Sequence, residues 1–134
     1  MPDEESSYSS DWFNIADKDL KRAEFLNSLP DPEASGFYLQ QTIEKYLKGY
    51  LLSKGWRLKR THDLNVLLDE AVEHNARLED FRSSCEEISK YYTIDRYPFF
   101  GAAGITKEEI EGGLRTAKKL IEAISQSIEK EQND

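Results

Sequence analysis

The densest group of chemistry-bearing residues is segment 54–62, KGWRLKRTH, which holds four cations, one tryptophan and one histidine. Arginine forms paired hydrogen bonds with phosphate oxygens, and an indole ring can stack on a nucleobase. The backbone N–H groups of a helix expected to start at Asp63 would add an anion-binding end. The segment therefore predicts a phosphate contact, with Arg57, Arg60 and His62 as candidate side chains. The alternative is a solvated loop with a half-buried Trp56.

His62 stands between Thr61 and Asp63, directly before the predicted helix. A histidine can take up a proton near neutral pH, and an arginine can neutralise the charge of a phosphorane-like transition state. Arg57, five residues earlier, has a spacing that fits such a pair. The alternative is a helix start, in which Thr61 or Asp63 caps the helix and His62 is a packed or capping side chain. We expect His74 only to place a favourable charge near a helix C-terminus.

Segment 91–98, YYTIDRYP, is the second unusual place, because three tyrosines crowd around an adjacent Asp95–Arg96 pair. Next to Pro98 and the glycine-containing stretch 101–104, Arg96 could present an oriented guanidinium in a groove, flanked by Asp95 and Tyr97. Tyrosines at a helix end also commonly cover a hydrophobic core, and that alternative stays open at this point.

Polar residues also recur along segment 40–48, within an otherwise apolar helical pattern. Lys45 and Lys48 are further candidates for binding phosphate. The four-residue spacing equally fits an exposed face with the side-chain pairs Glu44–Lys48 and Gln41–Lys45.

The composition excludes several classes of site and protein. Cys85 is the lone cysteine and there are two histidines, so we predict no disulfide framework, no metal site and no cofactor, and expect a reducing, cytoplasmic setting. No apolar run approaches the roughly 20 residues of a membrane span, and the acidic start does not resemble a secretory signal. The net charge of −8 argues against a non-specific coat on DNA or RNA, so a polyanion must meet a local patch.

The elements that must position these residues are helices. Apolar residues recur at three- and four-residue steps in the segments 11–28, 32–53, 63–75 and 106–128, and from residue 78 to a stop before Pro98. Asp31 and Thr106 are predicted N-caps, Glu109 completes a capping box, and Gly55 is the expected stop of the second helix. The prediction is an all-α protein, an antiparallel up-and-down bundle of four to five helices over residues 11–129. Residues 1–10 and 130–134 are expected to be flexible tails.

In this order and spacing, the sequence resembles the HEPN domain family of small all-helical domains associated with nucleotide and RNA chemistry. The resemblance covers about residues 11–127. It is carried by Trp12 with Ala16, Asp19 and Leu20; by Gln40, Gln41, Ile43, Glu44, Lys45, Leu47 and Lys48; by Thr61, His62, Asp63 and Leu64; and by Tyr92, Asp95, Arg96, Tyr97 and Pro98. It implies a homodimer with a polar groove at its interface. It also implies a minimal nucleotidyltransferase as partner, in pairs regarded as toxin and antitoxin.

The chain departs from the family at one position. Active ribonucleases of the family carry an arginine followed four to six residues later by a histidine. Here no histidine follows Arg96, which places nuclease activity in doubt. Arg57 and His62 have the required spacing but lie before the third predicted helix, where the family's pair is not normally found.

Three hypotheses follow. The first is a non-catalytic or weakly catalytic HEPN module, dimeric, that binds a nucleotide, an RNA end or a nucleotidyltransferase partner through a groove lined by Lys45, His62, Asp95, Arg96 and Tyr97. The second is a metal-independent RNA endonuclease, toxin-like, in which His62 is the base and Arg57 or Arg96 stabilises the phosphate. The third is a non-catalytic helical dimerisation or adaptor domain, whose interface is the apolar stripe from Ile110 to Ile128.

Overall fold

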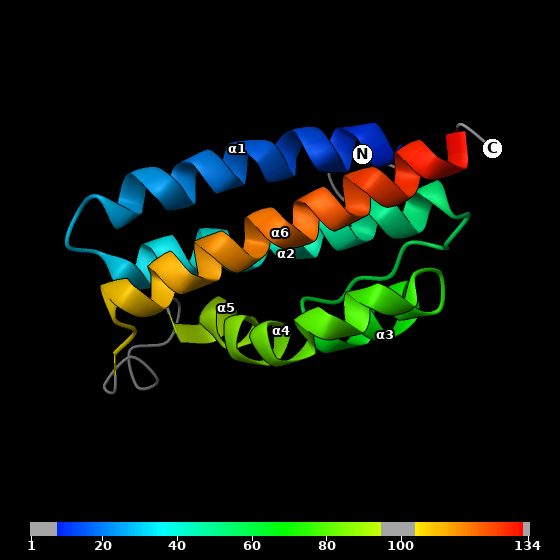
Figure 1. Cartoon of the computed structure of the whole chain (residues 1–134). Helices are drawn as coiled ribbons and strands as arrows, with labels where there is room; N and C mark the ends of the chain where they lie inside the picture. The colour runs from blue at the N-terminus through cyan, green and yellow to red at the C-terminus, as the bar shows by residue number, and fades with distance from the viewer. Residues whose placement is uncertain (1–7, 95–103, 133–134) are drawn as a thin grey trace.

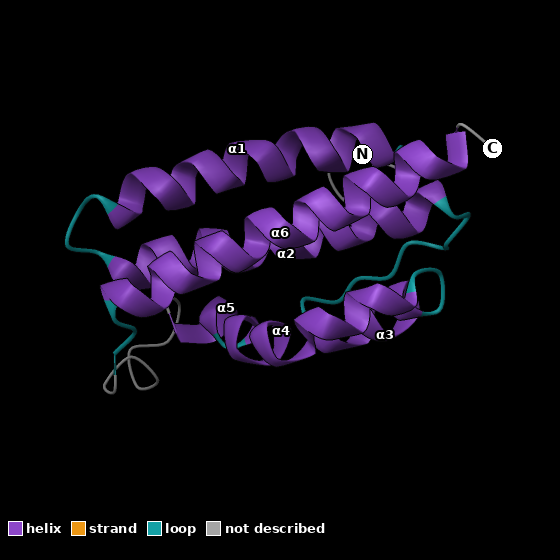
Figure 2. Cartoon of the chain, in the orientation of Figure 1, coloured by secondary structure: helices purple, strands orange, loops and turns teal. Residues whose placement is uncertain are grey.

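The computed structural model describes residues 8–94 and 104–132. Every regular element in those ranges is helical, as predicted (Figures 1 and 2). The elements are α1 (Ser9–Asn27), α2 (Pro32–Ser53), α3 (Leu64–Val72), the 3₁₀ helix η1 (Ala76–Phe81), α4 (Arg82–Ser89), α5 (Tyr91–Ile94) and α6 (Lys107–Gln132). Helical structure thus includes Ser9 and reaches Gln132, a few residues into both segments that the sequence predicted as tails.

Helices α1 and α2 form an antiparallel pair whose connection follows the predicted caps. The Asp31 side chain accepts a hydrogen bond from the Ala34 N–H at 3.2 Å, and Pro32 occupies the first turn of α2. At the other end Gly55 has φ +84°, and the N–H groups of Gly55 and Trp56 donate to the carbonyls of Leu52 and Leu51. This is a Schellman motif, which requires a left-handed residue where the sequence has glycine.

The segment after residue 62 is more broken than the sequence predicted. The third helix ends at Val72 and not at Asn75, because the Asn75 side chain instead accepts a hydrogen bond from the Arg77 N–H and begins η1. The single helix expected from residue 78 is divided into η1, α4 and α5. Ser89, at the end of α4, accepts a hydrogen bond from the Leu64 N–H, which ties this region to the start of α3.

Helix α6 begins with the predicted capping box. The Thr106 N–H donates to Glu109 Oε1 and the Glu109 N–H donates to Thr106 Oγ1, each at 3.1 Å. In Figure 1 α6 runs along the same length of the bundle as α2. The apolar stripe of α6 packs into the core of this chain, where Ile110, Ala117 and Ile124 are fully buried. Most of the stripe that the adaptor hypothesis assigned to an interface is therefore buried within this chain, and Ile121 and Ile128 are partly buried.

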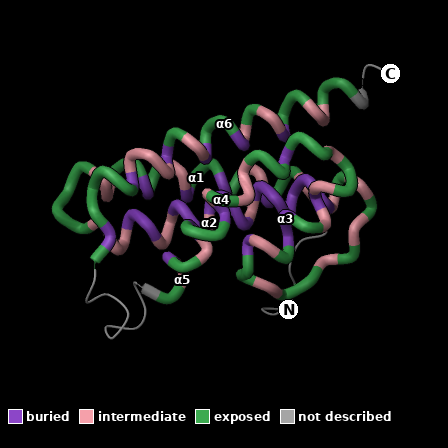
Figure 3. The backbone as a smooth tube through the Cα atoms, turned by 60° about the horizontal axis from the view of Figure 1, so that its bottom comes forward, coloured by how far each residue is buried: buried purple, intermediate pink, exposed green. Residues whose placement is uncertain are grey.

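Helix α2 is the centre of the fold, since it contacts α1 and each of α3, α4, α5 and α6. Most of α2 is buried, as the colouring in Figure 3 shows. Gly113 allows α6 to approach it: a Cβ at Gly113 would lie 2.6 Å from Leu39 Cδ2, whereas one at Gly112 would meet nothing closer than 3.7 Å. Of these two neighbouring glycines, Gly113 is the one that a close approach of α6 to α2 explains.

Candidate functional site

A buried carboxylate organises the polar face of α2. Glu44 Oε1 accepts hydrogen bonds from Gln40 Nε2 at 3.1 Å and from His62 Nδ1 at 2.9 Å, and Oε2 pairs with Lys48 Nζ at 3.0 Å. Glu44 and Lys48 are each 2% exposed. The predicted Glu44–Lys48 pair therefore exists, but the interpretation of this stripe as an exposed face is wrong. The His62 end of the 54–63 connection covers it, and Lys48 Nζ lies 5.3 Å from the Trp12 ring of α1.

These contacts fix the orientation of His62. Because an ionised carboxylate only accepts hydrogen bonds, the His62 ring donates from Nδ1, and Nε2 is the ring nitrogen left for other partners. Gln40 Nε2 also donates to the His62 carbonyl at 2.9 Å, and Gln41 Nε2 donates to Gln40 Oε1 at 2.8 Å. Both the ring and the backbone of His62 are thus bonded to α2, while its side chain is 52% exposed.

The His62 ring is stacked on an aromatic ring from another element. Its centroid lies 4.2 Å from that of Tyr92 in α5, with the two planes 16° apart. On α2, the Phe37 ring stacks on Tyr92 at 5.8 Å and 30°. Three rings that are distant in the sequence therefore form one aromatic cluster beside the Glu44 carboxylate.

A second charged group joins α1 to α2. Asp19, 1% exposed, accepts from Lys45 Nζ at 2.5 Å and from an Arg22 guanidinium nitrogen at 2.6 Å. The predicted pairing of Lys45 with Gln41 is therefore wrong, because the lysine ammonium forms a charged bond with the buried carboxylate of Asp19 instead. The consequence for the site is that Lys45 is held toward α1, on a different carboxylate from Lys48.

One tyrosine hydroxyl adds to the same helix pair. Tyr46 donates to Asp17, and burial, together with that carboxylate, raises the pKa of Tyr46 above its usual value. The hydroxyl stays protonated at neutral pH, so this contact stabilises the α1–α2 packing and offers no base to the site.

The basic segment is attached to α3 through one carboxylate. Glu70 accepts from the Trp56 indole N–H at 3.0 Å and from Lys59 Nζ at 2.8 Å. Trp56 is partly buried against the core, as the loop alternative expected. Arg57 and Arg60 are exposed on this connection and are not part of the Glu44 cluster.

The structure thus gathers part of the predicted site. It brings His62 and Lys48 to one carboxylate and adds Glu44, Gln40 and Tyr92, whose roles the local sequence did not reveal. Asp95, Arg96 and Tyr97 lie outside the described residues. Within residues 8–94 and 104–132, no group of three or more His, Cys, Asp or Glu side chains is placed to hold a metal ion. No helix in those ranges is long and apolar enough to cross a membrane.

Comparison with known proteins identifies one family. The model of the HEPN domain matches residues 9–128, which is nearly the whole chain and contains every element that builds the Glu44 cluster. No curated protein and no solved structure matches the sequence significantly.

Proposed function

The chain belongs to the HEPN domain family, and we propose that it is a nucleotide- or RNA-binding module whose contact site is the surface formed by His62 and Tyr92. The observation that carries the proposal is the half-exposed His62 ring, stacked on Tyr92 and bonded through Nδ1 to the buried Glu44. Single-stranded nucleic acids are recognised by stacking bases on aromatic rings and by hydrogen bonds to phosphate and base edges.

The buried part of the cluster supports this proposal. Lys48 balances the charge of Glu44, so the carboxylate holds the histidine without remaining an unpaired buried charge. His62 is held both at its ring nitrogen Nδ1 and at its backbone carbonyl. Its side chain therefore loses little conformational freedom when a ligand binds. Arg57 and Arg60, exposed on the connection that leads into His62, would supply the local positive charge for phosphate groups.

The binding experiment uses a set of nucleotides and short single-stranded RNAs, titrated by calorimetry or fluorescence anisotropy. We expect His62→Ala to weaken binding about tenfold or more, since stacking of one base contributes about 1–3 kcal/mol. Tyr92→Ala should also weaken binding, because the His62 ring then loses the ring on which it is stacked. Tyr8→Ala is the matched aromatic control, because Tyr8 is 71% exposed at the start of α1. Absence of binding, or equal affinity in all three variants, would contradict the proposal. Arg96→Ala tests the arginine of the family pattern, which follows Tyr92 by four residues in the sequence.

Two parts of the proposal rest on the family resemblance alone. We propose that the module works as a homodimer and that it acts with a minimal nucleotidyltransferase partner in a toxin–antitoxin-like pair. Sedimentation velocity at tens of micromolar protein tests the first part, and a monomer there contradicts it. Co-expression with a nucleotidyltransferase encoded beside this chain, followed by size-exclusion chromatography, tests the second, for which failure to co-elute is the contrary result.

The geometry of His62 also favours a second candidate function, metal-independent RNA cleavage. With Nδ1 bonded to Glu44, Nε2 of the neutral ring could take the proton of a ribose 2′-hydroxyl. The 2′-oxygen would then attack phosphorus, the 5′-oxygen would leave and take a proton from water, and the product would be a 2′,3′-cyclic phosphate. Arg57 or Arg96 would stabilise the charge on the phosphoryl oxygens.

This second function has its own test. RNA is incubated with the protein in EDTA, and we expect His62→Ala to lower the cleavage rate at least about a hundredfold, the lower range for loss of a general base. Arg57→Ala and Arg96→Ala then show which arginine contributes. RNA that stays intact with the unmodified chain excludes cleavage and leaves the binding function to its separate titration.

A further inference from the structure

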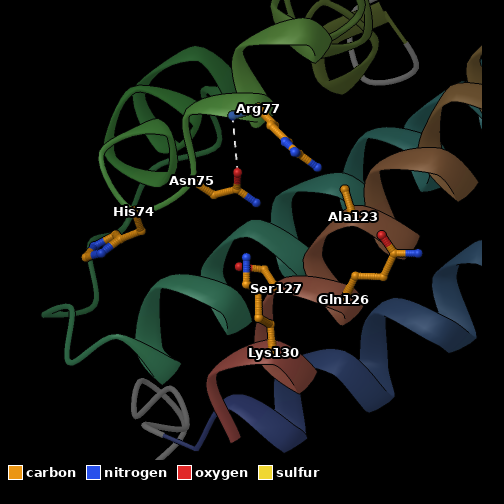
Figure 4. Close-up of a pocket in the computed structure, with 7 residues that line it drawn as sticks. All are labelled: His74, Asn75, Arg77, Ala123, Gln126, Ser127 and Lys130. Atoms are coloured by element: carbon orange, nitrogen blue, oxygen red, sulfur yellow. Dashed lines mark hydrogen bonds between the residues drawn. The ribbon is translucent and has the colours of Figure 1, made fainter. Parts of the chain in front are cut away.

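A cleft of about 510 Å³ lies at another part of the bundle, between the α3–η1 turn and the C-terminal half of α6. In Figure 4, Asn75 and Arg77 lie on one wall, and the α6 residues Gln126, Ser127 and Lys130 lie on the other. The residues that line it are His74, Asn75, Arg77, Ala123, Gln126, Ser127 and Lys130. None of them is used by the Glu44 cluster.

The charge of this cleft is opposite to that of the whole chain. Arg77 and Lys130 are both exposed, and the lining contains no Asp or Glu, although the chain has a net charge of −8. In the described part of the chain, no carboxylate lies within ion-pair distance of Arg77 or Lys130, whereas Arg82 pairs with Asp69 and Glu79. Among the residues that the structure describes, the positive charge of the cleft is therefore not paired with a carboxylate.

The neutral side chains of the cleft include oriented hydrogen-bonding groups. The Asn75 side-chain oxygen accepts from the Arg77 N–H at 3.1 Å, so its NH₂ group is turned away from the backbone and toward the cleft (Figure 4). Ser127 Oγ lies 3.1 Å from the hydroxyl of the fully buried Tyr50, which fixes its position on α6. These groups and the two cations come from facing walls, as donors for an oxyanion would be arranged.

We propose that this cleft binds a small phosphorylated molecule through its phosphoryl dianion. Two cations on opposite walls match a doubly charged group better than a single carboxylate, and the arginine fork fits two phosphoryl oxygens. The cleft is larger than inorganic phosphate requires. Its volume is about 510 Å³, whereas one water molecule occupies about 30 Å³ in the liquid, so the cleft has room for an organic group beside the phosphoryl group. The cleft is separate from the His62 surface. His62 lies before the first residue of α3, the cleft lies after its last residue, and the helix between them is about 13 Å long.

The experiment titrates inorganic phosphate and ribose 5-phosphate into the ¹⁵N-labelled full chain, with sodium chloride at equal ionic strength as reference. We expect saturable shifts of the amide signals of His74, Asn75 and Ser127, with ribose 5-phosphate binding more tightly than phosphate. Arg77→Ala and Lys130→Ala should each weaken binding about tenfold, the loss expected for one hydrogen bond to a charged group. Arg115→Ala is the matched control, because Arg115 is exposed on α6 and does not line the cleft.

The following results would overturn the proposal. Shifts that sodium chloride reproduces, or that persist unchanged in Arg77→Ala and Lys130→Ala, mean that the cleft responds to ionic strength only. A loss of ribose 5-phosphate binding in Arg57→Ala but not in Arg77→Ala places the phosphate on the 54–63 connection and overturns it as well. Because Arg77 and Lys130 are exposed, their variants should keep the fold, and a thermal unfolding curve checks this.

Discussion

The substitution Lys48→Met tests the buried charge pair of the site. Methionine keeps most of the volume of lysine and removes only the ammonium, so Glu44 stays buried without its nearest cation. At 3.0 Å and an effective dielectric constant of about 20, that attraction is about 5 kcal/mol, and part of it is offset because the ammonium no longer has to be desolvated. We expect the free energy of unfolding to fall by about 3 kcal/mol, measured by urea denaturation followed by circular dichroism.

The control is a lysine–glutamate ion pair on the surface that has the same distance between nitrogen and oxygen. Lys118 Nζ lies 3.0 Å from Glu24 Oε2, but both side chains are largely exposed, so Lys118→Met should cost under about 1 kcal/mol. The double variant Glu44→Gln with Lys48→Met should recover most of the loss, because no uncompensated charge remains. Equal costs for the two lysines, or strictly additive costs for Glu44→Gln and Lys48→Met, would refute this account of the cluster.

Three further predictions concern packing and ionisation. Gly112→Ala should stabilise the chain by up to about 1 kcal/mol, whereas Gly113→Ala should destabilise it because of Leu39; chemical denaturation of both measures the difference. Burial raises the pKa of the Cys85 thiol to about 12, so a thiol reagent at pH 8 should label native Cys85 only at the rate of opening, and fast labelling contradicts this. Burial, with smaller contributions from two carboxylates, also raises the pKa of Tyr91 from 10.0 to about 12. The unfolded chain therefore loses this proton first, and stability should fall by about 2–3 kcal/mol between these pH values, a loss that Tyr91→Phe removes in denaturation curves.

Helix ends could be predicted from the sequence because their causes are local. The Thr106–Glu109 box, the Asp31 cap and the Gly55 stop each depend on residues within a few positions of one another. Asn75 shows the limit of such signals: an asparagine suits the end of one helix and the start of the next, and here its side chain caps η1. The choice depends on how the following chain packs against α3.

The burial of Glu44 and Lys48 could not be predicted in the same way. A glutamate and a lysine four residues apart give the same pattern on an exposed face and in an interior. What buries them is the packing of α1 and of the 54–63 connection, neither of which has a periodicity that specifies its neighbour. The family resemblance singled out these residues together with His62, but the hydrogen bonds that join them depend on three-dimensional contacts.

The composition of this cluster argues for a role in orienting His62. A buried ion pair is commonly replaced by apolar residues of similar volume with little loss of stability or with a gain, so stability alone does not explain Glu44 and Lys48 at the centre of the fold. A hydrophobic pair at these two positions would leave the His62 ring without its Nδ1 acceptor and free to rotate on a surface that is half-exposed. The carboxylate is therefore needed for the histidine, and the lysine is needed for the carboxylate. The double variant Glu44→Leu with Lys48→Met, which removes the Nδ1 acceptor as well as the charges, should therefore unfold nearly like the unmodified chain yet bind nucleotides or RNA more weakly.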